Sequence, residues 1–273
     1  MKSLLIVGFG DIARRAAPGL ETRHALEPLS RRTGFDLDRP ATLAGLRGAD
    51  AVLHCAPPPA TGATDPRTRN LLAALAKARI LPARVVYVST SGVYGDCAGE
   101  LVDESRIPRP QTERAHRRLD AERQLGAWCA ERSVALTVLR APGIYAAERL
   151  PESRLRAGTP VLRDEDDIYT SHIHADDLAA AAVRALEDDA PAGVFNACDD
   201  TQMKMGEWFD FLAGRLGLPP APRITRAEAP GRIAPSLLSF MSESRRLDNR
   251  RMKRVLGVAL RHPTVHDGLP EAG

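Results

Sequence analysis

Two glycines and a small residue near the start of this 273-residue chain have a spacing that suits phosphate binding. Gly8, Gly10 and Ala13 form the pattern Gly-x-Gly-x-x-Ala, directly after a run of apolar residues. The first glycine of such a turn permits a tight bend, the second lets a pyrophosphate approach the backbone, and the small residue lets helix and strand pack closely. The helix then offers free N–H groups to the phosphates. We predict a dinucleotide site here; the alternative is a strand-to-helix turn that binds no ligand.

A basic pair stands where dinucleotide-binding folds recognise the ribose of the cofactor. Arg31 and Arg32 follow the second predicted strand, about twenty residues beyond the glycines. An acidic residue here would hold the ribose 2′-hydroxyl of NAD, whereas guanidinium groups suit the 2′-phosphate of NADP. We therefore expect NADP as the cofactor, with NAD as the alternative. The competing interpretation is that both arginines are solvated loop residues, since the chain is rich in arginine.

These residues require a sheet that brings several strand ends together. Strands are indicated at residues 3–7, 24–29, 50–56, 84–90, 134–140 and 193–197. Helical segments separate them, at residues 11–20, 67–79, 112–132 and 174–186. This alternation predicts an α/β fold with a doubly wound parallel sheet, the Rossmann arrangement. We also expect a short strand at residues 34–38 and a helix at residues 43–46.

The last third of the chain reads as a small lobe docked on the sheet. We predict an NAD(P)-binding domain over residues 1–200 and a C-terminal substrate-binding lobe over residues 201–273, with residues 142–172 contributing to the lobe. Ligands of open α/β sheets bind at the carboxyl ends of the strands, which places the cofactor in the loops there. The predicted cofactor-binding residues are Gly8, Gly10, Asp11, Ile12, Arg31, Arg32, Asp36, Leu37, Ala56, Arg118 and Pro142.

The composition narrows the range of partners and sites. The net charge is +3 and the basic residues are scattered, so neither a nucleic acid nor a membrane is expected as a partner. The first residues read as a strand rather than a signal peptide, and no apolar run reaches spanning length, which predicts a cytoplasmic protein. The four cysteines are widely separated without metal-ligand spacing, so no metal site is predicted. The expected partner is a small-molecule substrate.

Several stretches resemble one enzyme superfamily. They are residues 88–96 with the sequence V-S-T-S-G-V-Y-G-D, residues 102–104, 173–178 and 195–197, and the segment 247–257. These stretches are similar to motifs of the extended and atypical short-chain dehydrogenase/reductases, the NAD(P)-dependent epimerase/dehydratase superfamily. The resemblance covers nearly the whole chain. It implies a Rossmann domain with a substrate lobe and is far less specific for a substrate.

The chemistry of that superfamily is only partly represented in the sequence. The resemblance implies that a Ser or Thr hydroxyl holds the reacting oxygen, and matching the V-Y-G at residues 93–95 places this hydroxyl at Thr90. The family's Tyr-x-x-x-Lys pair is missing, and Arg114 and Arg118 stand at its positions by register. Arginine stays protonated, so Arg114 cannot replace a phenol in proton transfer. Arg118 remains suited to hold the cofactor ribose or phosphate as a fixed cation.

Other side chains are candidates for the missing chemistry. Tyr94 is a phenol expected at the mouth of the site, although a packing role in the turn is an equal alternative. The predicted catalytic residues are therefore Thr90 and Tyr94. His172 and His174 flank Ile173, so both would face the same side of a strand; the alternative is that His174 caps the helix that follows it. Residues 103–104 are expected to form a solvated loop.

Two functions follow from these observations. The first is an NADP-dependent oxidoreductase or epimerase acting on a small polar or nucleotide-sugar-like carbonyl or alcohol. The second is a non-catalytic NADP-binding sensor or regulatory protein that has lost the Tyr-x-x-x-Lys pair. A homodimer is also expected, because the helix at residues 112–132 resembles one that pairs in dimers of the superfamily and carries Leu119, Leu125 and Trp128.

Overall fold

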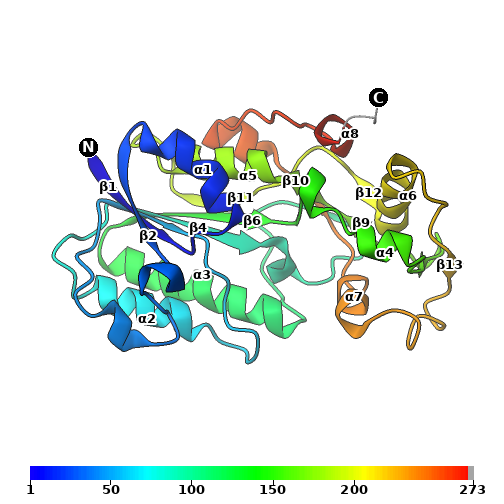
Figure 1. The fold of residues 1–273 in the computed structure, drawn as a ribbon, viewed down its shortest axis with the longest axis horizontal. Helices are drawn as coiled ribbons and strands as arrows, with labels where there is room; N and C mark the ends of the chain where they lie inside the picture. The colour runs from blue at the N-terminus through cyan, green and yellow to red at the C-terminus, as the bar shows by residue number, and fades with distance from the viewer. Residues whose placement is uncertain (270–273) are drawn as a thin grey trace.

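A six-stranded parallel sheet forms the centre of the molecule (Figure 1). The computed structural model describes residues 1–269. The strands are β1 (Lys2–Val7), β2 (His24–Leu29), β3 (Ala51–His54), β4 (Arg84–Thr90), β6 (Ala135–Ala141) and β11 (Gly193–Asn196), in the order β11-β6-β4-β3-β1-β2. All neighbours are parallel. The chain winds outward in both directions from β1 and β3, so the switch point where ligands bind in such sheets lies between these two strands.

Helices cover both faces of the sheet (Figure 1). One layer contains α1 (Asp11–Glu21) and α5 (Ala175–Ala185), and the other contains α2 (Pro66–Leu75) and α3 (Glu113–Glu131). Leu4 and Ile6 of β1 pack into the first layer, whereas Leu5 and Val7 pack into the second. This division follows from the alternation of side chains along a strand. The predicted doubly wound α/β fold is confirmed.

A further hydrophobic cluster lies beyond the carboxyl ends of the strands, around α6 (Met205–Arg215) (Figure 1). It joins residues from two stretches, 145–168 and 205–269. Its other elements are short: β7 (Gly143–Tyr145), η4 (Ala147–Arg149), α4 (Glu152–Arg156), β8 (Val161–Leu162), β9 (Tyr169–Thr170), β10 (His172–His174), β12 (Met203–Lys204), β13 (Arg223–Ile224), α7 (Pro235–Phe240) and α8 (Val265–Gly268). Among the remaining elements, η3 (Ser91–Tyr94) follows β4, and β5 (Leu101–Val102) pairs with β14 (Arg246–Leu247). The π-helical turn η5 (Met252–Leu256) packs into the layer of α1 and α5 through Met252 and Leu256. Because β14 pairs with β5, the last part of the chain is tied back to the sheet.

The strand expected at residues 34–38 is wrong. This segment is a loop between two 3₁₀ turns, η1 (Arg31–Thr33) and η2 (Pro40–Leu43), and the helix expected at residues 43–46 is also absent from the described chain. The hydroxyl of Thr42 accepts a hydrogen bond from the Asp36 backbone N–H, and the Asp36 carboxylate accepts one from the Asp38 N–H. These local side-chain bonds satisfy the backbone in place of a strand partner.

The helix α3 turns its large apolar side chains toward its own sheet. Leu119, Leu125 and Trp128 are all buried within the chain. They therefore offer no exposed surface to a second copy, and the homodimer stays a prediction that would need other residues. No helix of residues 1–269 combines the length and apolar character needed to cross a bilayer.

Candidate functional site

The glycine turn between β1 and α1 is shaped by a close approach to the end of β3. Gly8 has a φ of +86°, and a Cβ there would lie 2.6 Å from the backbone N and Cα of Ala56. Any side chain at Gly8 would therefore be strained and would collide with the neighbouring backbone. The space around Gly10 is open by contrast, since a Cβ there would meet nothing within 4 Å. No side chain caps the N-terminus of α1, so the turn combines open space with free N–H groups.

This combination fits the pyrophosphate of a dinucleotide. Asp11 begins α1, and its carboxylate pairs with the guanidinium group of Arg149 at 2.7 Å. The side chain of Ile12 is buried in the core. Contacts from Ile12 to a phosphate would have to come from its backbone.

A hollow of about 160 Å³ lies beside this turn, in a place that suits the adenosine end of a dinucleotide. It is lined by Gly8, Leu29, Ser30, Arg31, Phe35, Asp36, Leu37, Ala56, Pro57 and Arg67. Five of the predicted cofactor residues, Gly8, Arg31, Asp36, Leu37 and Ala56, are therefore brought together here.

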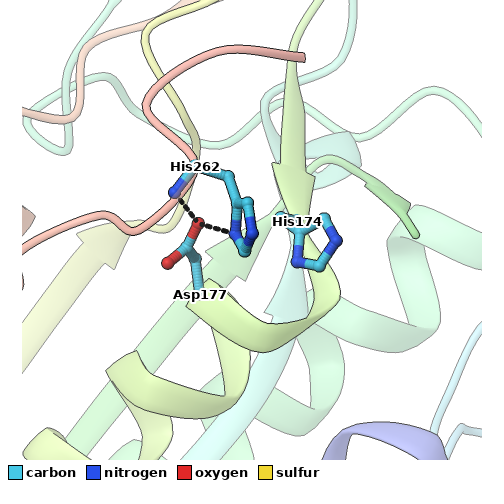
Figure 2. Close-up of side chains that lie close together, drawn as sticks. All are labelled: His174, Asp177 and His262. Carbon is cyan, nitrogen blue, oxygen red and sulfur yellow. Dashed lines mark hydrogen bonds and ion pairs between the residues drawn. The ribbon is translucent and has the colours of Figure 1, made fainter. Parts of the chain in front are cut away.

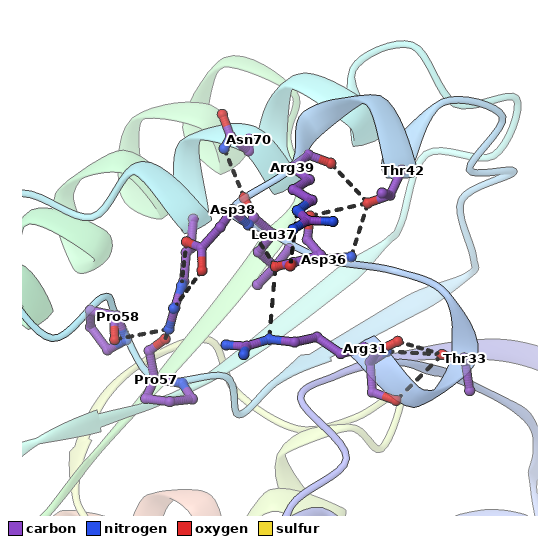
Figure 3. A network of polar contacts seen from close by, with 12 residues as sticks. Arg31, Thr33, Asp36, Leu37, Asp38, Arg39, Thr42, Pro57, Pro58 and Asn70 are labelled. Atoms are coloured by element: carbon purple, nitrogen blue, oxygen red, sulfur yellow. Dashed lines mark hydrogen bonds and ion pairs between the residues drawn. The ribbon is translucent and has the colours of Figure 1, made fainter.

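Polar contacts hold the rim of this hollow (Figure 3). Arg67 pairs with the carboxylate of Asp38 at 2.7 Å and donates to the carbonyl oxygen of Pro57 at 3.0 Å, and its hydrogen bond keeps the pKa of Asp38 below the ordinary value. Arg31 is 71% exposed and lies 3.8 Å from the carboxylate of Asp36. Arg32 is exposed as well. Both guanidinium groups of the basic pair are accessible to a ligand at the end of β2.

Thr90 ends β4 and lies in a separate cavity of about 140 Å³. The Thr90 hydroxyl accepts a hydrogen bond from the Gly92 N–H at 3.2 Å, which leaves its own proton available to a ligand. The lining combines the end of the sheet with the lobe: Thr90, Ser91, Gly92, Arg114, Pro142, Gly143, Ile168, Tyr169, Thr170, Ser171, Met205, Phe240, Glu243, Arg245 and Leu247. Two predicted residues, Thr90 and Pro142, share this cavity.

Tyr94 does not line this cavity. Its side chain is 1% exposed, and its hydroxyl donates to Oδ1 of Asn196 at 2.8 Å. Burial raises the pKa of Tyr94 to about 12. The expected position at the mouth of the site is therefore wrong, because the ring is enclosed by the core. The structure favours the alternative packing role.

Arg114 and Arg118, which stand by register where the family has its Tyr-x-x-x-Lys pair, make different contacts. Arg114 lines the Thr90 cavity, with its guanidinium carbon 3.9 Å from the centre of the Phe240 ring. Arg118 instead donates to the Tyr87 hydroxyl and to the Val88 carbonyl oxygen, both at 3.0 Å. Arg118 is thus tied to β4, and the predicted contact between its side chain and a cofactor stays a prediction.

Five polar residues of the cavity were not anticipated from the sequence. The sequence analysis assigned no motif to any of them: Tyr169, Thr170, Ser171, Glu243 and Arg245. Tyr169 lines the cavity, and the guanidinium group of Arg246 lies over its ring, 5.0 Å from the ring centre. Arg245 donates to the Gly95 carbonyl oxygen at 2.8 Å and to Glu243 at 2.9 Å. Their proximity to Thr90 arises from packing of the lobe, which the local sequence does not indicate.

A compact group of His174, Asp177 and His262 lies at the start of α5 (Figure 2). His174 caps the helix as expected, since its Nδ1 accepts from the Asp176 N–H at 3.2 Å. The carboxylate of Asp177 accepts from the backbone N–H groups of Arg261 and His262 at 2.7 and 2.9 Å, and lies 3.1 Å from the His262 ring. The two imidazole rings lie against each other at a tilt of 36°, with their centres 3.9 Å apart. This arrangement clamps the C-terminal segment onto α5, so we assign it a structural role.

One family model matches more than half of the chain. The NAD dependent epimerase/dehydratase family model covers residues 14–198. A curated relative, a 3-diazoavenalumate denitrifying reductase from a Streptomyces species, is 32% identical over 132 residues. That match spans 48% of this chain and only 43% of the relative.

Solved structures resemble the chain over nearly its full length. A functionally unknown conserved protein from Silicibacter pomeroyi DSS has a TM-score of 0.78 and 29% identity, covering 98% of this chain and 97% of its own. MoeE5 in complex with UDP-glucose and NAD has a TM-score of 0.75 and 23% identity, with 98% and 96% covered. The resemblance inferred from the sequence motifs is confirmed. The chain belongs to the NAD-dependent epimerase/dehydratase family.

Proposed function

We propose that this protein is an NADP-dependent reductase of a small polar substrate. One observation carries the proposal: the Gly8–Ala56 turn and the Thr90 cavity lie at the carboxyl ends of three adjacent strands, β1, β3 and β4. A dinucleotide that lies across these strand ends extends from the phosphate turn toward the cavity of Thr90.

The preference for NADP rests on the basic pair. Arg31 and Arg32 are exposed at the end of β2, where the ribose 2′-position of a cofactor lies in this fold. A guanidinium group forms strong charge-assisted hydrogen bonds with a phosphate. Asp36, 3.8 Å from Arg31, is the residue through which NAD would compete, because a carboxylate accepts hydrogen bonds from an unmodified ribose.

A bound NADPH would supply a hydride to an electrophilic carbon of the substrate. For a carbonyl substrate the oxygen must then gain a proton, and the hydroxyl of Thr90 is in position to donate a hydrogen bond to that oxygen. Arg114 cannot provide the proton. Among the lining residues Tyr169 carries a phenol, so this residue or a water molecule would fill this role. A substrate that loses a leaving group when it accepts the hydride needs no proton from the protein. The name of the curated relative, a denitrifying reductase, describes a reaction of this kind.

A sensor without catalysis is the second candidate. The observation that favours it is the pair Arg114 and Arg118 at the positions of the family's Tyr and Lys, with Arg118 bound to Tyr87 and Val88 rather than free. The cavity around Thr90 argues for an enzyme, because a protein that only binds and senses the cofactor needs no substrate cavity.

Fluorescence titration with NADPH and NADH, followed by an NADPH-consumption screen over small aldehydes, ketones and sugar nucleotides, separates these functions. We expect tighter binding of NADPH and its consumption with a small carbonyl compound. Tight binding of NADPH without any turnover would favour the sensor. Failure of both cofactors to bind would contradict both functions.

A further inference from the structure

Arg114 is a half-buried cation, and none of the side chains that the structure describes is its polar partner. Its guanidinium group lies against the face of Phe240, at 3.9 Å from the ring centre, and no described side chain or carbonyl group accepts a hydrogen bond from it. The aromatic face attracts a cation but uses none of its N–H donors. The five N–H groups of Arg114 are therefore left to whatever fills the cavity.

The other charges of the cavity are already balanced. Arg245 and Glu243 form an ion pair at 2.9 Å, in which both side chains are largely buried. With this pair neutral, Arg114 leaves the cavity with one uncompensated positive charge. Burial lowers the pKa of Arg114, and Glu243 nearby partly opposes that effect. An arginine nonetheless stays charged, so a charge removed from water here calls for an anion.

The size of the cavity narrows the class of anion. A volume of about 140 Å³ accommodates a compact organic acid and is far below what a nucleoside diphosphate sugar needs. Ile168, Met205 and Phe240 provide an apolar wall for the body of such a molecule. Thr90 and Ser171 provide hydroxyl groups at the polar end.

The carboxylate of Glu243, one of the lining residues, has an oxygen that makes no hydrogen bond to a described residue. This oxygen, Oε1, is buried, whereas the other carboxylate oxygen bonds Arg245. A hydroxyl or amino group on the ligand would satisfy this acceptor. Arg114 and Glu243 together form a site for a molecule that carries an anion and a hydrogen-bond donor.

We propose that Arg114 is an anion receptor that selects substrates bearing a single carboxylate group and a hydrogen-bond donor. In this role the arginine orients the substrate in the cavity at the position where other family members hold their phenol. The proposal rests on the proposed function for the identity of the cavity as the substrate site, but the binding of a carboxylate can be measured independently of turnover.

Isothermal titration calorimetry of the full chain, with and without saturating NADP, tests this site with matched pairs of probes. The pairs are 3-hydroxybenzoate with 3-hydroxybenzamide, and 4-hydroxybutanoate with 4-hydroxybutanamide, which differ in charge but little in size. We expect one carboxylate at least to bind about tenfold or more tightly than its amide, as befits a charge-assisted contact. UDP-glucose is the third arm and should show no Arg114-dependent binding, because the cavity is too small for it.

Variants of Arg114 test whether this residue causes the preference for the carboxylate over the amide. Arg114→Gln should abolish the preference for the carboxylate, Arg114→Lys should retain part of it, and Arg123→Gln, which removes an exposed charge from the same helix, should leave it unchanged. Arg114→Met, which keeps an apolar stem over Phe240, replaces the Gln variant if that fails to fold. Equal binding of acids and amides by the wild type would overturn the proposal. So would a preference that survives loss of Arg114, or Arg114-dependent binding of UDP-glucose alone. Loss of NADP binding with an intact carboxylate site would instead contradict the proposed function.

Discussion

The hydroxyl of Tyr94 donates a hydrogen bond to Oδ1 of Asn196 at 2.8 Å, and both side chains are fully enclosed. Asn196 ends β11, and its amide nitrogen donates to the carbonyl oxygens of Val102 and Asp248 at 3.0 and 3.2 Å. This pair therefore joins the turn after β4, the last strand of the sheet and the C-terminal segment. A residue of the family's V-Y-G motif thus has a structural function here.

Tyr94→Phe should lower stability without a comparable effect on catalysis. The substitution leaves Oδ1 of Asn196 buried without a donor, which costs about 1–3 kcal/mol. Urea unfolding measures the loss, and steady-state kinetics with an identified substrate should show nearly unchanged kcat. Tyr169→Phe is the matched control, since it removes a phenol from the cavity wall. A large fall in kcat for Tyr94→Phe with unchanged stability would contradict the packing role.

The two glycines of the turn should respond differently to substitution. Gly10→Val should abolish NADPH binding while the melting temperature stays close to that of the wild type, because the space around Gly10 is open. Gly8→Ala should lower both, since its Cβ would collide with the backbone of Ala56. Fluorescence titration and thermal unfolding of both variants distinguish these effects. Normal NADPH binding by Gly10→Val would mean that the cofactor lies elsewhere.

Arg31→Asp should reverse much of the preference for NADPH over NADH. Loss of a charge-assisted contact to the 2′-phosphate costs about 1.5–3 kcal/mol, which corresponds to about tenfold or more in affinity. NADH affinity should change little, because its ribose carries no phosphate. Arg123→Asp, an exposed arginine on α3, serves as the control for net charge. Equal affinities of the wild type for both cofactors would be incompatible with the NADP proposal.

Thr90→Val should depress turnover while leaving NADPH affinity nearly unchanged. The hydroxyl of Thr90 is a hydrogen-bond donor at the cavity, and removal of one such donor costs a factor of about 10² to 10³ in rate. Thr90→Ser keeps the hydroxyl and the bond from the Gly92 N–H, so it should retain most activity. Full activity of Thr90→Val on the true substrate would place the active site elsewhere.

Asp199 should make the stability of the protein depend on pH. Burial raises its pKa from 3.8 to about 8, so the folded chain holds a proton that the unfolded chain releases near pH 4. The contribution of this group to the free energy of unfolding is therefore fully present below about pH 4 and is lost as the pH rises toward 8.

In the native chain the Asp199 carboxylate accepts a hydrogen bond from the Thr201 N–H at 2.9 Å. Asp199→Asn removes the pH-dependent contribution but keeps an oxygen that can accept this bond. Urea unfolding at pH 5 and pH 8 should show a smaller difference for the variant than for the wild type. An equal pH dependence in both proteins would show that Asp199 titrates normally.

Features set by neighbours along the chain could be predicted from the sequence. The alternation of apolar strands and helices was sufficient for the doubly wound sheet, because burial on both faces requires apolar runs of strand length. The turn at Gly8 and Gly10 follows from backbone freedom within a few residues. The cap of α5 by His174 is equally local, since the acceptor and the N–H that it bonds are two residues apart.

Features set by packing between distant parts of the chain could not be predicted from the sequence. Residues 34–38 read as a strand, but the sheet offers them no partner and Thr42 and Asp36 satisfy their backbone instead. Glu104 read as a solvated loop residue, yet its carboxylate accepts from the Asn196 N–H at 2.7 Å. The sequence also left two roles open for Tyr94, and only the position of Asn196 decided between them.

The cavity itself is the clearest case. The sequence alone predicted that Thr90 stands at a strand end, and its family resemblance implied that Arg114 takes the place of a tyrosine on the next long helix. Only the tertiary structure brought Phe240, Glu243 and Arg245 to the same cavity, more than a hundred residues later in the chain. Local propensity fixes where strands and helices begin and end, but which surfaces they bury against one another depends on the packing of the whole chain.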